Sequence, residues 1–214
     1  MIDRQAISAM RNREVAHFIA ANPKSKAQAD KAQGWFQGVP FHWMLDWSTP
    51  FPIVAQAASG ATLTSIDGQV FDDFCLGDTA SMFGHSPAPL AKAIAEQAEQ
   101  GLSYMLPTAM GAELGAMLTE MFGLPQWQVT TTASEANRAV IRWCRGITGR
   151  DKILIFNGCY HGAVDDVFVD LRDGQAANRP SLIGQVQDLL PTTVVIEFND
   201  VDALAAALRG GDIA

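Results

Sequence analysis

The chain has 214 residues, of which 48% are hydrophobic, and it carries a formal net charge of −8 at pH 7. This apolar content is enough for one good-sized globular domain or a large part of a bigger one. Neither lysine nor arginine is massed anywhere, which argues against nucleic acid or an anionic membrane surface as a partner. No apolar run approaches the length of a membrane span.

The cysteines and the first residues indicate a reduced, cytoplasmic protein. Cys75, Cys144 and Cys159 are odd in number and widely spaced, which fits free thiols better than a disulfide framework. Cys159 lies close to His161, but no second ligand pair follows at zinc-finger spacing, so we predict no metal site. The start of the chain lacks the apolar core of a secretion signal, so we expect a cytoplasmic location.

The first 33 residues are expected to form a helix and a connector. Apolar side chains recur near helical spacing over residues 2–21, and Pro23 ends this run. Residues 24–31 are polar and are interpreted as a solvated connector or a weak helix.

Residues 34–52 are dense in large aromatic side chains that follow no helical period. They are Trp35, Phe36, Phe41, Trp43, Trp47 and Phe51. We expect this stretch to be a loop packed onto another part of the protein, although simple core residues would give the same pattern.

A hairpin and two helices are predicted next. Alternation around Asp67-Gly68 predicts paired strands over residues 61–66 and 69–74. Apolar spacing and terminal glycines predict helices over residues 86–100 and 112–122.

The second half of the chain reads as alternating strands and helices. We predict a strand at 127–132, a helix at 134–148 and a strand at 152–156, which together form a parallel βαβ unit. The inner face of this helix is expected to carry Ala136, Val140, Trp143 and Ile147. Residues 171–186 read as an exposed excursion, after which a strand at 193–198 and a helix at 201–208 follow.

The junction before the 134–148 helix has the features of an anion site. A run of β-favouring residues stops at Ala133, and Ser134 then opens the helix, whose first N–H groups have no intrahelical partner. Ser134 either caps this helix or offers its hydroxyl to an anion. Tyr160 and His161 follow the next strand, so both segments are expected at the carboxyl edge of one sheet.

Several motifs along residues 35–210 occur together in the order of a known family. They are Asp67-Gly68, Asp73-Phe74, Gly77, Gly84 to Pro87, Thr132 to Asn137, Gly149 to Ile153 and Phe156 to Gly162. With these motifs the chain resembles the class III aminotransferases, pyridoxal-phosphate enzymes of fold type I, and within them the glutamate-1-semialdehyde aminomutase branch. The resemblance implies a three-layer αβα fold with a parallel-rich sheet.

The resemblance also implies a cofactor site. By position, Ala133 and Ser134 match the family's phosphate-binding pair, flanked by Thr132, and Tyr160 matches the aromatic residue that stacks on the pyridine ring, with His161 beside it. The family usually has Gly where Ala133 stands and Ser where Thr132 stands, so the phosphate cup is expected to be slightly recast.

The implied catalytic residues lie outside the sequence. Family members are longer, and their Schiff-base lysine and pyridine-nitrogen aspartate fall beyond Ala214, so the chain is expected to be an amino-terminal fragment that is inactive alone. Its expected domains are residues 1–33 (helix and connector), 34–110 (small-domain hairpin, loops and helix) and 111–214 (the first part of the large domain).

The aminomutase branch carries an arginine for the substrate carboxylate in the aromatic stretch, and this chain has no arginine between Arg13 and Arg138. His42 is the only candidate cation there, which favours a transaminase acting on a different, bulkier amino acid.

The implied reaction is amino-group transfer from a small-molecule amino donor to a keto or aldehyde acceptor, in a homodimer. No Gly-x-Gly-x-x-Gly follows a strand, which argues against a dinucleotide-binding dehydrogenase. A non-catalytic short chain that acts as a dimerisation or binding module remains an alternative.

Overall fold

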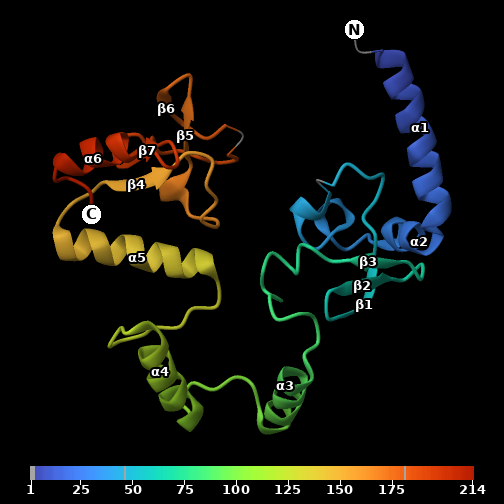
Figure 1. Ribbon diagram of the computed structural model, residues 1–214, viewed down its shortest axis with the longest axis horizontal. Coiled ribbons are helices and arrows are strands. Elements are labelled where there is room, and N and C mark those ends of the chain that lie inside the picture. Colours follow the sequence, from blue (N-terminus) through green and yellow to red (C-terminus); the bar gives the residue numbers. More distant parts are fainter. Residues whose placement is uncertain (1–2, 46, 181) are drawn as a thin grey trace. The chain divides into compact units, whose positions relative to one another are not determined.

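The structure is a computed structural model that describes residues 3–45, 47–180 and 182–214 (Figure 1). The chain divides into two compact units, Met1–Leu106 and Pro107–Ala214. Each unit has its own secondary structure.

The first unit begins with two helices, α1 (Arg4–Ala21) and α2 (Pro23–Lys31). α1 is capped by Asp3, whose carboxylate accepts the backbone N–H groups of Gln5 and Ala6. The polar segment 24–31, for which a connector or weak helix was expected, is helical. Pro23 is well suited to the first turn of α2 because its missing N–H would have no partner there.

A three-stranded antiparallel sheet follows, formed by β1 (Ala55–Ser59), β2 (Thr62–Ser65) and β3 (Val70–Asp72) in that order. The pairing of β2 with β3 confirms the predicted hairpin, with shorter strands. β1 was not predicted, because Ala55–Ser59 carries small side chains without a strong β signal.

The hairpin turn is tied to α2 through a buried serine. The Asp67 carboxylate accepts the backbone N–H groups of Lys24 and Ser25 at 2.7 and 3.0 Å, together with the Ser25 hydroxyl proton. The Ser25 oxygen in turn accepts the N–H of Val54 at 3.1 Å. The side chain that caps α2 therefore comes from a turn more than 40 residues away in sequence, which fixes the hairpin to the helix.

The aromatic stretch forms two short 3-10 helices, Phe36–Gly38 and His42–Leu45. Phe51 is buried, and its ring centroid lies 5.1 Å from that of Phe18 in α1. The other rings that the sequence expectation grouped with Phe51 are exposed: Trp35, Phe36, Phe41, Trp43 and Trp47. One ring of the stretch is therefore in the core of the unit, whereas the others are largely exposed, although Trp43 and Trp47 also line a cavity together with residues of β2 and β3.

The loop after β3 leads to α3 (Ala88–Gln100) and is held by His85. The His85 backbone exchanges two hydrogen bonds with the Gly60 backbone, at 2.8 and 3.0 Å. The His85 imidazole Nε2 lies 2.6 Å from a carboxylate oxygen of Asp73. Ser86 has a positive φ of 52°, so α3 begins at Ala88 and not at Ser86 as expected. His85 thus has a structural role in this loop.

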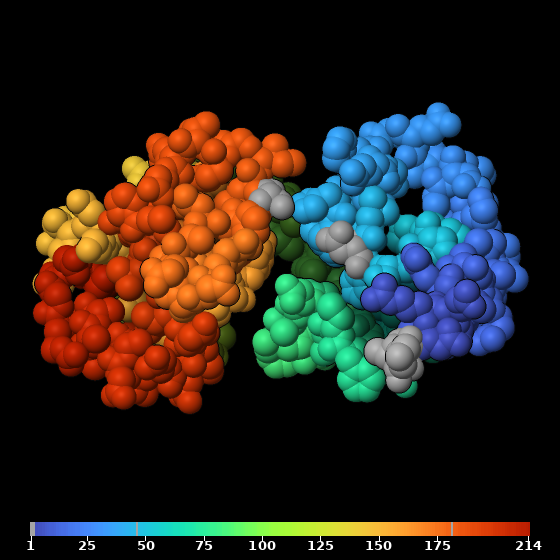
Figure 2. All heavy atoms as spheres, turned by 90° about the horizontal axis from the view of Figure 1, so that it is seen from above, coloured from blue at the N-terminus to red at the C-terminus, as the bar shows by residue number. Residues whose placement is uncertain are grey.

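The second unit contains α4 (Ala109–Phe122), α5 (Ala133–Thr148) and α6 (Val201–Arg209). Its strands are β4 (Ile153–Phe156), β5 (Val169–Arg172), β6 (Gln175–Asn178) and β7 (Thr193–Ile196). β4 and β7 pair in parallel, while β5 and β6 form an antiparallel hairpin that overlaps the segment 171–186, which was expected to be an exposed excursion. In Figure 2 atoms of this segment (orange) and of α6 (red) are visible on the face of the unit that is shown.

The core of the second unit is built from residues of β4, β5, β7 and the loops between them. Its buried members are Ile153, Ile155, Val164, Val167, Val169, Leu189 and Val195. Because alternate residues of β4 (Ile153 and Ile155) and Val195 of β7 belong to this cluster, one face of the parallel pair is covered by the chain that connects the two strands.

The predicted strand at 127–132 is wrong, and with it the first βαβ unit. This stretch has no strand partner among the residues that the structure describes. Its threonines bond locally instead: the Thr130 hydroxyl donates to the Thr132 carbonyl, and the Thr131 N–H and hydroxyl donate to the Glu135 carboxylate. Such side-chain contacts offer the backbone an alternative to a sheet ladder.

The predicted inner face of α5 is also largely exposed. Val140 and Trp143 are each 52% exposed and Ile147 is 85% exposed, whereas Ile141 packs against the core cluster. Ile141 lies about 100° around the helix from Val140, so a different side of α5 from the predicted one meets the core.

Candidate functional site

The amino-terminal end of α5 is capped by Thr132. Its hydroxyl oxygen accepts the N–H of Glu135 at 3.2 Å, and the helix begins at Ala133. The possibility that Ser134 is the cap is therefore wrong, which leaves its hydroxyl for another contact. The hydrogen bond from the Thr131 hydroxyl, followed by that from the Thr131 N–H, lowers the pKa of the Glu135 carboxyl.

Ser134 joins the helix to the turn that follows β4. Its hydroxyl oxygen accepts the backbone N–H of Ala163 at 3.0 Å. Because a hydroxyl both accepts and donates, the proton of Ser134 remains available to an anion at the helix end. The first N–H groups of α5 have no intrahelical acceptor, and the helix dipole adds partial positive charge there.

Gly162 makes the closest approach between the two segments. A Cβ atom built on it would overlap the Ser134 hydroxyl oxygen and lie 3.0 Å from both Cα and Cβ of Ser134. Gly162 also has a positive φ of 86°, a conformation that favours glycine. A glycine is thus required here by space and by backbone geometry alike.

The turn places its two predicted site residues differently. Tyr160 is 76% exposed. The His161 backbone carbonyl accepts a hydrogen bond from the Asn137 amide at 2.9 Å, and its ring nitrogen Nε2 is buried with no hydrogen-bond partner in the described part of the chain. The structure therefore brings Ser134, Gly162 and the His161 backbone together, with the Tyr160 ring on the surface beside them.

On its other side the turn is contacted by Arg179. The guanidinium donates to one carboxylate oxygen of Asp170 through Nε at 3.1 Å and a terminal nitrogen at 2.9 Å, and that terminal nitrogen also reaches the Cys159 carbonyl at 3.4 Å. It lies over the ring of Phe168, 5.5 Å from its centroid. A cavity of about 420 Å³ adjoins this ion pair. Its lining residues are Asn157, Gly158, Cys159, Tyr160, Asp170, Leu171, Arg172 and Arg179.

Sequence reasoning missed three residues of this arrangement as site residues. Asn137 and Gly162 stand inside the two quoted motifs, one helical turn after Ser134 and two residues after Tyr160, so their spacing could have found them. Arg179 lies in the segment interpreted as an exposed excursion, and no local signal connects it with Cys159.

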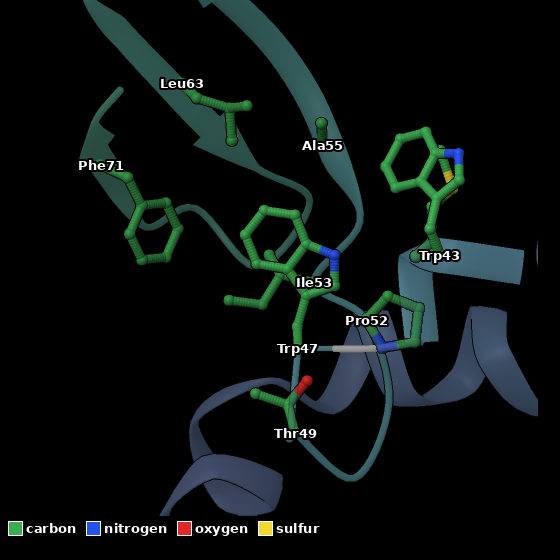
Figure 3. Close-up of a pocket in the computed structure, with 9 residues that line it drawn as sticks. Trp43, Trp47, Thr49, Pro52, Ile53, Ala55, Leu63 and Phe71 are labelled. Atoms are coloured by element: carbon green, nitrogen blue, oxygen red, sulfur yellow. The ribbon is translucent and has the colours of Figure 1, made fainter. Parts of the chain in front are cut away.

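The first unit contains a separate apolar cavity of about 470 Å³ (Figure 3). Its lining residues are Trp43, Met44, Trp47, Thr49, Pro52, Ile53, Ala55, Leu63 and Phe71. Among the residues that the structure describes, this lining includes no charged side chain, and His42, the candidate cation, is not part of it. The aromatic stretch thus forms an apolar wall over the strands of the sheet.

Comparison with known proteins identifies the family. Residues 44–206 match the family model described as aminotransferase class-III. The chain belongs to the class III aminotransferases. This confirms the family expected from the motifs.

Relatives of this class III chain include a curated glutamate-1-semialdehyde 2,1-aminomutase from Methanothrix thermoacetophila. It is 34% identical over 167 residues, which cover 77% of the chain and 39% of the relative. Among solved structures, a glutamate-1-semialdehyde aminomutase from Pseudomonas aeruginosa PAO1, in complex with PMP, has 42% identity and a TM-score of 0.91, covering 99% of the chain and 47% of that protein. An omega-transaminase from Sphaerobacter thermophilus has 28% identity and a TM-score of 0.77, covering 89% and 45%.

These likenesses show that the class III chain has the mixed α/β fold of the fold type I enzymes. The chain spans about two fifths of the length of the curated relatives and just under half of the solved structures that it matches. In the described ranges, no helix is both long enough and apolar enough to cross a membrane.

Proposed function

We propose that the protein performs amino-group transfer with pyridoxal 5'-phosphate as its cofactor. The observation that carries this proposal is the contact between the end of α5 and the turn after β4, made by Ser134 with Ala163 and Gly162. It supports a phosphate site beside an exposed aromatic ring, on a chain whose relatives include aminomutases and transaminases.

The proposed roles follow from the contacts. The backbone N–H groups of Ala133 and Ser134 and the Ser134 hydroxyl bind the phosphate, while Thr132 holds the helix end open by capping it. Tyr160 stacks on the pyridine ring, and its exposed ring has an apolar face for this purpose. The buried Nε2 of His161 is available to a polar group of the cofactor. The cofactor itself supplies the electron sink for the chemistry.

The fit is supported by the residues present. Ala133 is exposed and adopts an ordinary helical conformation, so its methyl group replaces the family's glycine without backbone strain. Binding of the Ala163 N–H leaves the Ser134 proton free, and His161 Nε2 is a buried polar atom that has no acceptor or donor in the described ranges.

We also propose that these 214 residues do not complete a turnover alone. The second unit has one lysine, Lys152, which pairs with Asp212 at 2.7 Å. Lys152 comes before β4, whereas Tyr160 comes after it, so the amine and the proposed ring partner lie at opposite ends of the strand. The reacting lysine would have to come from elsewhere in the whole protein.

The finer assignments are part of the same proposal. The substrates are a small-molecule amino donor and a keto or aldehyde acceptor, and the whole protein is a cytoplasmic homodimer. Residues 1–33, 34–110 and 111–214 are its domain divisions. The lining of the apolar cavity, as far as the described residues form it, supports a different and bulkier substrate than that of the aminomutases.

The test is a titration of the protein, as its gene encodes it, with pyridoxal phosphate, followed by visible absorbance. Ser134→Ala should weaken the affinity by about 10- to 100-fold, because it removes a hydrogen bond to a charged group. Ser103→Ala, at an exposed serine, is the matched control and should leave the affinity unchanged. If the unaltered protein does not bind the cofactor, the proposed function is wrong and the non-catalytic alternative gains support.

A further inference from the structure

The orientation of the Tyr160 ring cannot come from packing. The side chain is 76% exposed and contributes nothing to the core cluster of its unit. An exposed aromatic side chain explores several rotamers unless its backbone is fixed and a partner is present. A ring that stacks on a cofactor therefore needs its backbone to be held in advance.

Two side chains hold the backbone on both sides of Tyr160, one from α5 and one from the residue that follows β6. Before it, the Cys159 carbonyl accepts from the Arg179 guanidinium at 3.4 Å. After it, the His161 carbonyl accepts from the Asn137 amide at 2.9 Å. Both peptide groups that flank the short segment are thus anchored, one toward β6 and one toward α5.

Each anchor is itself held in place. Asn137 lies on α5, one turn after Ser134, and its side chain is partly buried. Arg179 is fixed by two hydrogen bonds to Asp170 and by the ring of Phe168, and its side chain is 24% exposed. A guanidinium with this many contacts loses little further freedom when it also binds a carbonyl.

We propose that Asn137 and Arg179 are positioning residues for Tyr160. They hold the turn so that the ring stands beside the end of α5, and they act on the cofactor only through that ring. This inference rests on the proposed function, because it assigns the two residues to the cofactor site described above.

The experiment is a double-mutant cycle on cofactor affinity, in the protein as its gene encodes it, with pyridoxal phosphate as the ligand. Asn137→Ala and Arg179→Met should each weaken the affinity by about 2- to 10-fold, the worth of one hydrogen bond. In a Tyr160→Ala background the same changes should have no further effect, because the ring they position is gone. Arg142→Met, at an exposed arginine of α5, is the control and should change neither background.

Visible circular dichroism of the bound cofactor supplies a second readout. This signal reports how the cofactor's pyridine ring is oriented in the site, and it does not report the stability of the protein. Asn137→Asp, which has the same shape but places an acceptor against the His161 carbonyl, should alter this signal as Asn137→Ala does. It also keeps the test available if the alanine variant does not fold.

Equal losses with Tyr160 intact and in the Tyr160→Ala background, together with an unchanged dichroism signal, would show that the two residues only stabilise the fold, and would overturn the inference. That outcome is distinct from failure of the proposed function, in which the unaltered protein itself does not bind pyridoxal phosphate.

Discussion

Replacement of Gly162 by alanine tests the contact on which the candidate site depends. The new Cβ would overlap the Ser134 hydroxyl oxygen and lie 3.0 Å from the Cα and Cβ atoms of the same residue. Ser134 cannot move freely, because it belongs to the first turn of α5. The turn after β4 would have to shift away from the helix.

The cost has two parts. A side chain at a φ of 86° costs about 1–2 kcal/mol of folding free energy. Forcing a methyl group into a space that is already filled costs about 1–3 kcal/mol more. We therefore expect Gly162→Ala to lower the free energy of unfolding by about 2–5 kcal/mol.

Gly158→Ala is the matched control. Gly158 has a φ of 72°, and a Cβ atom there would meet nothing within 4 Å. Its replacement should cost only the backbone strain, about 1–2 kcal/mol. The reduced freedom of the unfolded chain is the same in both variants, so it cancels in the comparison.

Urea unfolding followed by far-ultraviolet circular dichroism measures both variants, and a pyridoxal phosphate titration follows the site. Gly162→Ala should be the less stable of the two and should also bind the cofactor more weakly. Equal stability and equal affinity for the two variants would refute the close contact between Gly162 and Ser134.

Three further predictions concern other contacts. Thr132→Ala should cost about 1 kcal/mol of folding free energy, as loss of a helix cap does. Thr132→Ser should retain most of the stability that the cap contributes, as measured by thermal melts. Ser25→Ala should cost about 1–3 kcal/mol in urea unfolding, because a buried hydroxyl that bonds the Asp67 carboxylate is removed. The hydrogen bond with His85 lowers the pKa of the Asp73 carboxyl, so the stability that Asp73 contributes should be complete above about pH 4 and lost as the pH falls through the lowered native pKa. Asp73→Asn should abolish this acid dependence, and an unchanged acid titration in that variant would contradict it.

The helices could be predicted well from the sequence because their ends carry local signals. Pro23 correctly marked the end of α1, although the start of α2 at this residue was not predicted, and Gly101 and Gly123 terminate α3 and α4 with positive φ angles that a glycine tolerates. β4 and β7 were also found, since their β-branched residues mark strands buried in a core.

The strands that sequence reasoning missed or misplaced depend on partners. The β5–β6 hairpin turns at Asp173-Gly174, the same dipeptide that revealed β2 and β3, so its signal was present in a segment read as irregular. Residues 127–132 have the β propensity of a strand but do not form one. No neighbouring strand pairs with them in the described part of the chain, and Thr131 donates hydrogen bonds to Glu135 instead.

In the candidate site, too, residues with a local sequence signal were predicted and residues that depend on distant partners were not. The two motifs identified Ser134 and Tyr160, and the structure places their segments in contact. The anchors Asn137 and Arg179 act on backbone carbonyls of other segments, and such contacts leave no periodic trace in a sequence.

An isolated parallel bridge between Lys152 and Ile213 gives the start of β4 a second neighbour in the sheet. Successive residues of a strand bond to opposite sides, and Ile153 donates to Thr192 beside β7 whereas Lys152 accepts from Ala214. β4 therefore begins as a middle strand with a neighbour on each flank. The turn that bears Tyr160 follows a strand that is paired with β7 along its whole length, so a small ligand could be held at this turn without rearrangement of the strand.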